Sequence, residues 1–439
     1  MARRLRSDFR TSLIDYIKSI LGSKDFVHRH RTHPRAFTRK RKLPFERLFW
    51  LIANFRNRCM QSEINQFLED CARDDAHVER LDDSTVFRAR QKLSPQAYQE
   101  MNQCCLAFVQ EHGQLKLWKG YRLCAVDGST LRLPAEGDIP ELFPPHTDKG
   151  GAPVGPPLAR INLLYDPLNK LSLSAELDPM TVAEIDQLRD HRWEWQKGQL
   201  LLADRHYGAF WVFAWLLKRR VDFCIRLTVG QRKLSEQFVA EGVAEKVVVF
   251  KPGRRARKKC RELGLSVDPI TLRLVRVELS TGEVEVLVTS VLDPEKISAQ
   301  EFGELYHMRW PVEEKFKQLK FRLNLENWSG KSAWTIYQDT FAQIWACNLA
   351  VLLGHGLEEE IQRRTENCKY PYQINWAGAF ATTKRVLIKL VFRGKPAIYL
   401  NRITECFLEQ LSPIRVNRKY AHNHKRYKRE FYMCYKFCC

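Results

Sequence analysis

The sequence predicts a mixed α/β fold, and three stretches of the chain carry that prediction. Between about residues 116 and 229, apolar or alternating segments and helical segments follow one another as strand, hairpin, helix, strand, helix, strand. Residues 230–295 are predicted to form a mainly β insertion, because KVVVF, TLRLVRVEL and VEVLVTSV are rich in β-branched residues. Residues 296–350 return to helical patterns and complete the core. A chain of 439 residues has room for two or three domains with cores of their own.

The two ends of the chain are predicted to be helical and to flank this core. Within residues 1–115, SEINQFLED and STVFRARQKL resemble two short helices joined by a turn at Asp82 and Asp83. Arg88 and Lys92 lie four residues apart on the second helix, which is equally typical of a recognition helix in a DNA major groove and of an exposed helix face. Residues 351–439 are predicted to form a helical region with a basic tail. The predicted domains are therefore 1–115, 116–229, 230–295, 296–350 and 351–439.

The positive charge is concentrated in three places. Residues 1–60 and 411–439 together hold 19 of the 21 net positive charges, and the run KPGRRARKKCR at 251–261 contains seven cations, among them Arg254, Arg255, Lys258 and Lys259. A solvated tail would explain any one of these patches, but three in one chain favour a nucleic-acid partner. The thirteen cysteines contain no C-x-x-C pair, and no apolar run reaches membrane-spanning length. We therefore expect a soluble cytoplasmic protein with reduced thiols and no membrane partner.

A polar stripe is predicted on the segment YHMRWPVEEKFKQLK, residues 306–320. On a continuous helix, Tyr306, Arg309, Glu313 and Lys320 fall within an arc of about 60°. Such a stripe is either solvated or a functional site. Pro311 is expected to kink or restart the helix, with Glu313 and Lys320 keeping their alignment in either case.

Two further carboxylates follow apolar strand segments. Asp127 interrupts LCAVDGSTLRL and Asp204 closes LLLAD, and sites often form at strand ends in α/β sheets. The structural alternatives are an Asp-Gly turn at the first and a helix cap at the second. If both converge with Glu313, the three would offer oxygen ligands for two Mg²⁺ ions and in-line attack on a phosphodiester.

These motifs resemble those of the DDE transposases of bacterial insertion sequences, in particular the IS-four group with its signature Tyr-x2-Arg-x3-Glu-x6-Lys. Tyr306, Arg309, Glu313 and Lys320 meet every spacing of that signature. The contexts VDGSTLRLP and LLADRHY of the other two acids are also similar to those of the group. Two features depart from it, because His206 stands where many relatives have glycine and Pro311 lies close to Glu313.

The resemblance implies an RNase H-like catalytic core, an N-terminal helical DNA-binding region and a homodimer that bridges two element ends. It implies Mg²⁺-dependent cleavage, with Mn²⁺ as a substitute, often through a hairpin, followed by strand transfer to target DNA. Asp127, Asp204 and Glu313 would be the catalytic metal ligands. Tyr306, Arg309 and Lys320 would contact phosphates of the double-stranded terminal inverted repeats. The expected location is the bacterial cytoplasm, in association with the nucleoid.

Two alternatives stay open at this point. One is a metal-dependent nuclease of the same fold that cuts but does not join, and the other is a catalytically silent, DNA-binding repressor derived from a transposase. The presence of all three acids argues against the silent form. Trp310 or Trp328 could stack on an extruded base, with packing in the core as the alternative for each.

Overall fold

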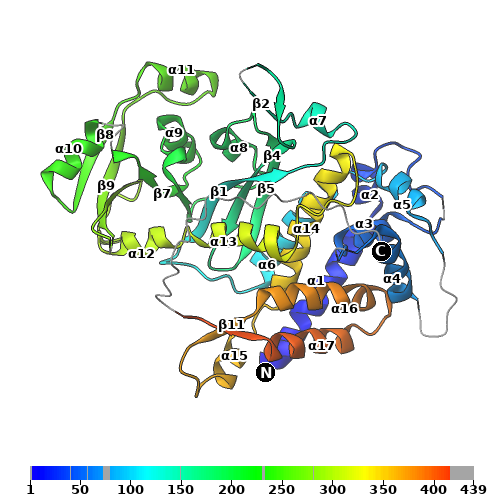
Figure 1. The fold of residues 1–439 in the computed structure, drawn as a ribbon. Coiled ribbons are helices and arrows are strands. Elements are labelled where there is room, and N and C mark those ends of the chain that lie inside the picture. The colour runs from blue at the N-terminus through cyan, green and yellow to red at the C-terminus, as the bar shows by residue number, and fades with distance from the viewer. Residues whose placement is uncertain are drawn as a thin grey trace. The chain divides into compact units, whose positions relative to one another are not determined.

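The computed structural model describes residues 2–39, 41–56, 58–72, 80–148, 150–229, 233–279 and 281–415, without the side chains of residues 2–8. The predicted basic tail lies beyond these residues from 416 onward. The chain divides into two compact units (Figure 1). Unit 1 comprises residues 1–114, 131–159 and 318–439, and unit 2 comprises residues 115–130 and 160–317.

Unit 2 is built on an eight-stranded sheet with the order β5-β4-β1-β6-β7-β10-β9-β8, drawn in cyan to green in Figure 1. A mixed α/β fold is therefore confirmed. The strands are β1 (Arg122–Arg132), β4 (Leu158–Asp166), β5 (Leu171–Pro179), β6 (Gln199–Ala203), β7 (Asp222–Leu227), β8 (Glu245–Phe250), β9 (Ile270–Glu278) and β10 (Val284–Thr289).

The centre of the sheet is parallel and buried on both faces. β6 pairs in parallel with β1 on one side and with β7 on the other, and all five residues of β6 are buried. Such strands have continuous apolar sequences because helical crossovers cover the sheet. The helices in these connections are α8 (Glu184–Asp190) and α9 (Phe210–Lys218), and α9 packs against β7.

The strands of region 230–295 belong to the central sheet. β10 pairs antiparallel with β7 and so extends this sheet through β9 to β8. The edge of β7 offers unpaired backbone groups, and β10 satisfies them. The region also contains two helices, α10 (Lys233–Glu241) and α11 (Arg254–Glu262), so the cationic run is helical. Lysine and arginine are good helix formers, but the strand-like segments on both sides of the run favoured a prediction of strands.

The segment predicted as one polar stripe is broken into three pieces. α12 (Glu301–His307) ends before Pro311, α13 spans Pro311–Lys317, and Gln318–Arg322 forms a π-helical turn. Proline has no amide hydrogen and fits the first turn of a helix, so it begins α13. Glu313 and Lys320 therefore do not lie on one continuous α-helix, because a π turn has a different angular step per residue.

Unit 1 is mainly helical and is organised around α14 (Ala333–Leu353), most of whose side chains are buried. α14 packs against α3, α6, α16 and α17. Ser332 begins it with a capping box shared with Thr335. The other helices are α1 (Ala2–Gly22), α2 (Lys24–His30), α3 (Phe45–Ala53), α4 (Met60–Cys71), α5 (Asp83–Arg90), α6 (Gln96–His112), α7 (Ile139–Leu142), α15 (Glu358–Arg364), α16 (Trp376–Phe392) and α17 (Pro396–Glu409). The short strands are β2 (His146–Thr147), β3 (Pro153–Val154), β11 (Tyr372–Ile374) and β12 (Leu411–Pro413).

A buried ion pair fixes α5 to α14. Arg90, at the end of α5, is fully buried, and its Nη2 lies 2.8 Å from Oδ1 of Asp339. Its Nε donates to Oε1 of Gln338 at 2.8 Å. A buried guanidinium needs such partners, so the orientation of α5 on the core of unit 1 is strongly constrained.

Within the described part of the chain, no single helix has both the length and the apolar character needed to cross a bilayer. α14 and α15 reach these limits only when they are counted together, and they are bent by 60° at their junction.

Candidate active site and basic pocket

Asp127 lies inside strand β1 and not at its end, which corrects the prediction from the sequence. β1 continues for five residues beyond it, and residues 122–126 are buried whereas residues 127–130 are partly exposed. The Asp-Gly pair is therefore part of a strand and not a turn. The strand leaves the apolar interior at Asp127, whose side chain is 18 % exposed.

Asp204 comes directly after β6, and the sheet register brings it beside Asp127. Ala125 of β1 is paired with Leu202 of β6, and these residues are 77 apart in sequence, as Asp127 and Asp204 also are. Neighbouring strands lie roughly 4.8 Å apart and matched residues face the same side. Asp204 also caps the turn Arg205–Tyr207, with Oδ1 accepting from the His206 amide and Oδ2 lying 2.8 Å from Nδ1 of His206.

Arg309 connects Glu313 with Asp127. Its Nη2 donates to Oε1 of Glu313 at 2.6 Å, one turn further along the chain, and its Nη1 lies 3.8 Å from Oδ2 of Asp127. The Arg309 side chain is only 7 % exposed, whereas that of Glu313 is 32 % exposed. One buried guanidinium is thus shared between two of the predicted catalytic acids.

Asp127 has a strongly raised pKa. Burial raises its pKa to about 7, Arg309 opposes the rise, and the carboxylates of Glu184, Glu313 and Asp204 add to it. Four acids therefore influence one another in this part of unit 2. Like charges held together disfavour ionisation unless a cation compensates them.

The chemistry of these side chains fits a hard divalent cation, since carboxylate oxygens are the ligands that Mg²⁺ prefers. Among the described residues, no three His, Cys, Asp or Glu side chains lie close enough as they stand to hold one ion. The Arg309 guanidinium supplies positive charge between Asp127 and Glu313.

Of the other two members of the signature, one is buried and the other is half-buried. Tyr306 is 5 % exposed, and burial raises the pKa of its phenol. Lys320, in unit 1, is half-buried, and burial lowers the pKa of its ammonium although Glu326 opposes the change. Trp310 is 50 % exposed, whereas Trp328 is buried and donates from Nε1 to the carbonyl of Arg132 at 2.8 Å.

Glu184 is a further carboxylate whose charge acts on Asp127, and it was not predicted from the sequence. It begins α8, and its Oε1 accepts a hydrogen bond from the Tyr207 hydroxyl at 3.0 Å. The sequence carries a weak signal, because this acid opens the helical segment between the hairpin and the strand that ends at Asp204. Acids at the start of a helix are common, so that signal alone does not distinguish it.

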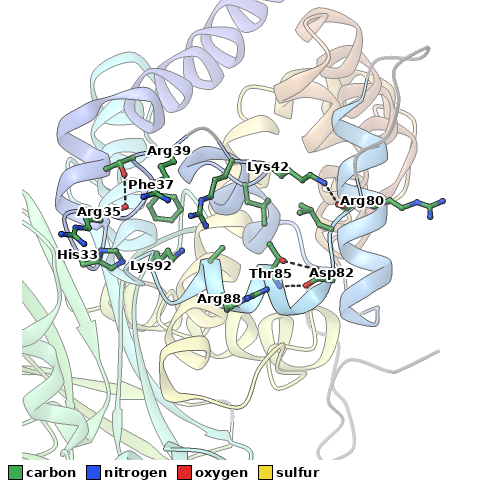
Figure 2. A pocket seen from close by; sticks show the side chains of 15 residues that line it. His33, Arg35, Phe37, Arg39, Lys42, Arg80, Asp82, Thr85, Arg88 and Lys92 are labelled. Atoms are coloured by element: carbon green, nitrogen blue, oxygen red, sulfur yellow. Dashed lines mark hydrogen bonds between the residues drawn. The ribbon is translucent and has the colours of Figure 1, made fainter.

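A second feature, in unit 1, is a strongly basic pocket of about 830 Å³ between residues 33–43 and the helix α5 (Figure 2). Its lining contains seven Lys or Arg side chains and one acid, Asp82. Asp82 caps α5 by accepting from the Thr85 amide, and its bonds to Ser84 and Thr85 lower its pKa to about 2. The cations are Arg35, Arg39, Arg41, Lys42, Arg80, Arg88 and Lys92.

Both residues predicted for a recognition helix line this pocket. Arg88 is on the exposed face of α5, whereas Lys92 lies beyond the end of that helix at Arg90. They share the pocket although they do not share a helix, as Figure 2 shows. The opposite wall is the segment that contains Arg35 and Phe37.

The four cations predicted from the 251–261 run lie on α11 but differ in exposure and in partners. Arg254, Arg255 and Lys258 are exposed. Lys259 instead pairs with Asp186 of α8, with its Nζ 3.0 Å from Oδ1, and lies 5.8 Å from the ring centre of Trp211. The first three are available to a partner, and Lys259 attaches α11 to its own unit.

Comparisons with known proteins agree with the geometry of unit 2. Residues 118–352, slightly more than half of the chain, match the family described as Transposase DDE domain. The chain is also similar to the transposase InsG for insertion sequence element IS4 from Escherichia coli (strain K12). The two are 25 % identical over 400 residues, which cover 87 % of this chain and 83 % of that protein.

Proposed function

The chain belongs to the DDE transposases, in the family of the IS4 element, and on that premise we propose that it binds the terminal inverted repeats of an insertion sequence and moves the element by Mg²⁺-dependent strand cleavage and strand transfer. A DDE domain implies an enzyme that breaks and joins phosphodiesters, acts on DNA and depends on a divalent metal. The inverted repeats, the choice of Mg²⁺ with Mn²⁺ as substitute, and the cut-and-paste course are the finer parts of the proposal.

One observation carries the proposal: Asp127 is linked to the other two predicted acids by independent features. The β1–β6 register supports its proximity to Asp204, and the shared guanidinium of Arg309 supports its proximity to Glu313. We assign Asp127, Asp204 and Glu313 as the residues that hold the cation. When bound, Mg²⁺ lowers the pKa of the attacking water or 3′-hydroxyl and stabilises the leaving oxygen.

Arg309 has two successive tasks in this proposal. In the free protein it compensates Asp127 and Glu313. Once a cation compensates those acids, its guanidinium is free to hold a phosphate in the bidentate manner that suits arginine. Tyr306 and Lys320 are proposed as further phosphate contacts on the family resemblance, and both need some exposure to reach DNA.

The DNA-binding regions are proposed from charge and exposure. The basic pocket, with Arg88 and Lys92 in its wall, would hold the backbone of the inverted repeat. Arg254, Arg255 and Lys258 on α11 would contact DNA through a separate exposed helix, and Lys259 would support it. The strand order β5-β4-β1-β6-β7 supports an RNase H-like core. The homodimer that bridges two ends, the nucleoid location and the five predicted domains are proposed on the resemblance and the sequence pattern.

The test uses the DNA that flanks the coding region, labelled at the element end. The protein with Mg²⁺ should cleave at that end and join the free 3′-hydroxyl to a target plasmid. Glu313→Gln keeps the side-chain size but removes the charge, so it should lower cleavage by a factor of about 10³ or more and leave end binding within roughly twofold. Cleavage that survives in Glu313→Gln contradicts the assignment.

The two alternatives give different results in the same assay. A nuclease of this fold would cut the end without joining it to the target. A silent repressor would bind the end and do neither with any divalent metal. Short terminal inverted repeats bounded by a direct duplication in the flanking DNA would support the transposase.

A further inference from the structure

Glu184 lies between Gly128, the residue after Asp127, and Tyr207, the last residue of the turn that Asp204 caps. Its carboxylate carbon would be 2.4 Å from a Cβ placed on Gly128, and its Oε2 would be 2.6 Å from that atom. Gly128 follows Asp127, so the missing side chain of this glycine is what leaves room for Glu184. On the other side, Tyr207 of the turn after Asp204 donates to Oε1. Glu184 thus contacts the strand that carries Asp127 and the turn that Asp204 caps, and its charge acts on Asp127.

A buried chain of hydrogen bonds orients the Glu184 carboxylate. Burial lowers the pKa of His191 to about 3, so its ring is neutral and donates from Nε2 to Oδ1 of Asn162 at 2.8 Å. The amide of Asn162 donates to the Tyr207 hydroxyl at 2.7 Å, and that hydroxyl donates to Glu184. Every donor in the chain therefore points toward the carboxylate. Asn162 and His191 are buried, so their positions are restricted by packing.

The negative charge of Glu184 is not needed for this chain of hydrogen bonds. A neutral Gln at 184 would still accept a hydrogen bond from Tyr207, although a weaker one, and it would not repel Asp127. Among the described residues, Oε2 of Glu184 accepts no hydrogen bond, and it is the oxygen beside Gly128. A charged carboxylate with one tethered and one available oxygen, next to other acids, is what binding a divalent cation requires.

We propose that Glu184 is a fourth carboxylate of the cation-binding site, held in position by Tyr207, Asn162 and His191. The inference rests on the proposed function, because it assigns a further residue to the same site. Glu184 adds negative charge and an oxygen donor, and the buried chain holds that donor beside Gly128, the residue after Asp127. Tyr207, Asn162 and His191 are positioning residues that act through Glu184.

The test measures cation binding separately from catalysis. The full-length protein is titrated with MnCl₂ without DNA, and its melting temperature is followed from an EDTA reference. Glu184→Gln should melt at the same or a higher temperature in EDTA, because repulsion with Asp127 is removed. Its midpoint for Mn²⁺ stabilisation should rise at least about tenfold, which corresponds to roughly 1.4 kcal/mol. Glu236→Gln, on the exposed face of α10, makes the same chemical change and should leave the midpoint unchanged.

The Mn²⁺ dependence of cleavage and the variant Tyr207→Phe test whether Glu184 has a purely structural role. The Mn²⁺ midpoint for strand cleavage should move by the same factor in Glu184→Gln, and excess Mn²⁺ should restore most of the rate. Tyr207→Phe keeps the charge of Glu184 but removes the hydrogen bond that holds it, so the Mn²⁺ midpoint of this variant should rise by about two- to threefold. A midpoint in Glu184→Gln equal to that of the wild type overturns the proposal, as does a lower melting temperature in EDTA with an unchanged midpoint.

Failure of the proposed function has a different signature. A wild-type protein that cleaves no end DNA at any Mn²⁺ concentration contradicts transposase activity. The Mn²⁺ stabilisation curves would still decide whether Glu184 binds the cation, because they need no DNA.

Discussion

Replacing Asp127 by Asn should remove activity and yet stabilise the cation-free protein. Burial and three neighbouring acids raise the pKa of Asp127 from 3.8 to about 7, despite the opposing effect of Arg309. A carboxyl group whose pKa is raised in the folded state binds more protons there than in the unfolded state. Stability is therefore lost as the pH rises from 3.8 to about 7, and the loss is complete above that range.

The magnitude follows from the size of the shift. Three pKa units at 1.36 kcal/mol each give about 4 kcal/mol at pH 8, of which roughly 2 kcal/mol develops between pH 5 and 7. The Asp127 side chain is only 18 % exposed, so solvent screening reduces this figure little. The amide introduced by Asp127→Asn cannot ionise, and this variant should therefore become increasingly more stable than the wild type across this pH range.

Urea unfolding in EDTA, followed by tryptophan fluorescence at pH 5, 6, 7 and 8, measures this difference. Titrating groups that do not interact with Asp127 are common to both proteins and cancel. Addition of MgCl₂ should then stabilise the wild type and not Asp127→Asn, because the variant lacks a ligand. A stability difference that is constant with pH, or a variant less stable than the wild type at pH 8, would refute the reasoning.

Two further predictions concern DNA binding and packing. Replacing Arg88 and Lys92 together by Ala should weaken end binding by about tenfold or more and make the slope of log affinity against log salt shallower by about two. The control Arg402→Ala, at an exposed position, should change neither quantity. Gel-shift titrations at several salt concentrations measure both. Trp328→Ala should lower the free energy of unfolding by about 3–5 kcal/mol, because a buried ring and its hydrogen bond are lost. Trp310→Ala should change it by less than about 1 kcal/mol, because that ring is half exposed. Chemical denaturation measures both changes, and equal losses would contradict the burial argument.

The order of elements in the core could be predicted from the sequence because each has a clear local pattern. The continuous apolar run of β6 predicts a strand buried on both faces, and Phe45–Ala53 is apolar enough to predict a buried helix. The signature spacing identified Arg309 and Glu313, which the structure brings into contact. At these positions the local sequence pattern and the tertiary structure agree.

Other features depend on pairing and packing that no local pattern encodes. Asp127-Gly128 has the composition of a turn, and only the neighbouring Glu184 explains why a glycine stands inside a strand. The strands of region 230–295 are recognisable as strands, but the pairing of β10 with β7 joins segments that are far apart in the sequence. The basic pocket joins residues 33–43 to α5, and only the fold shows that Arg35 and Arg88 line the same cavity.

The extension of the central sheet through β10 affects how this protein can be shortened. Removing residues 233–289 would leave β7 as an open edge that contains the buried residues Phe223 and Ile225. Exposed apolar edges recruit strands from other chains, so such a truncation would favour aggregation. Residues 233–289 therefore serve as a permanent cover for the catalytic sheet, and a smaller version of this enzyme would need a replacement strand at that edge.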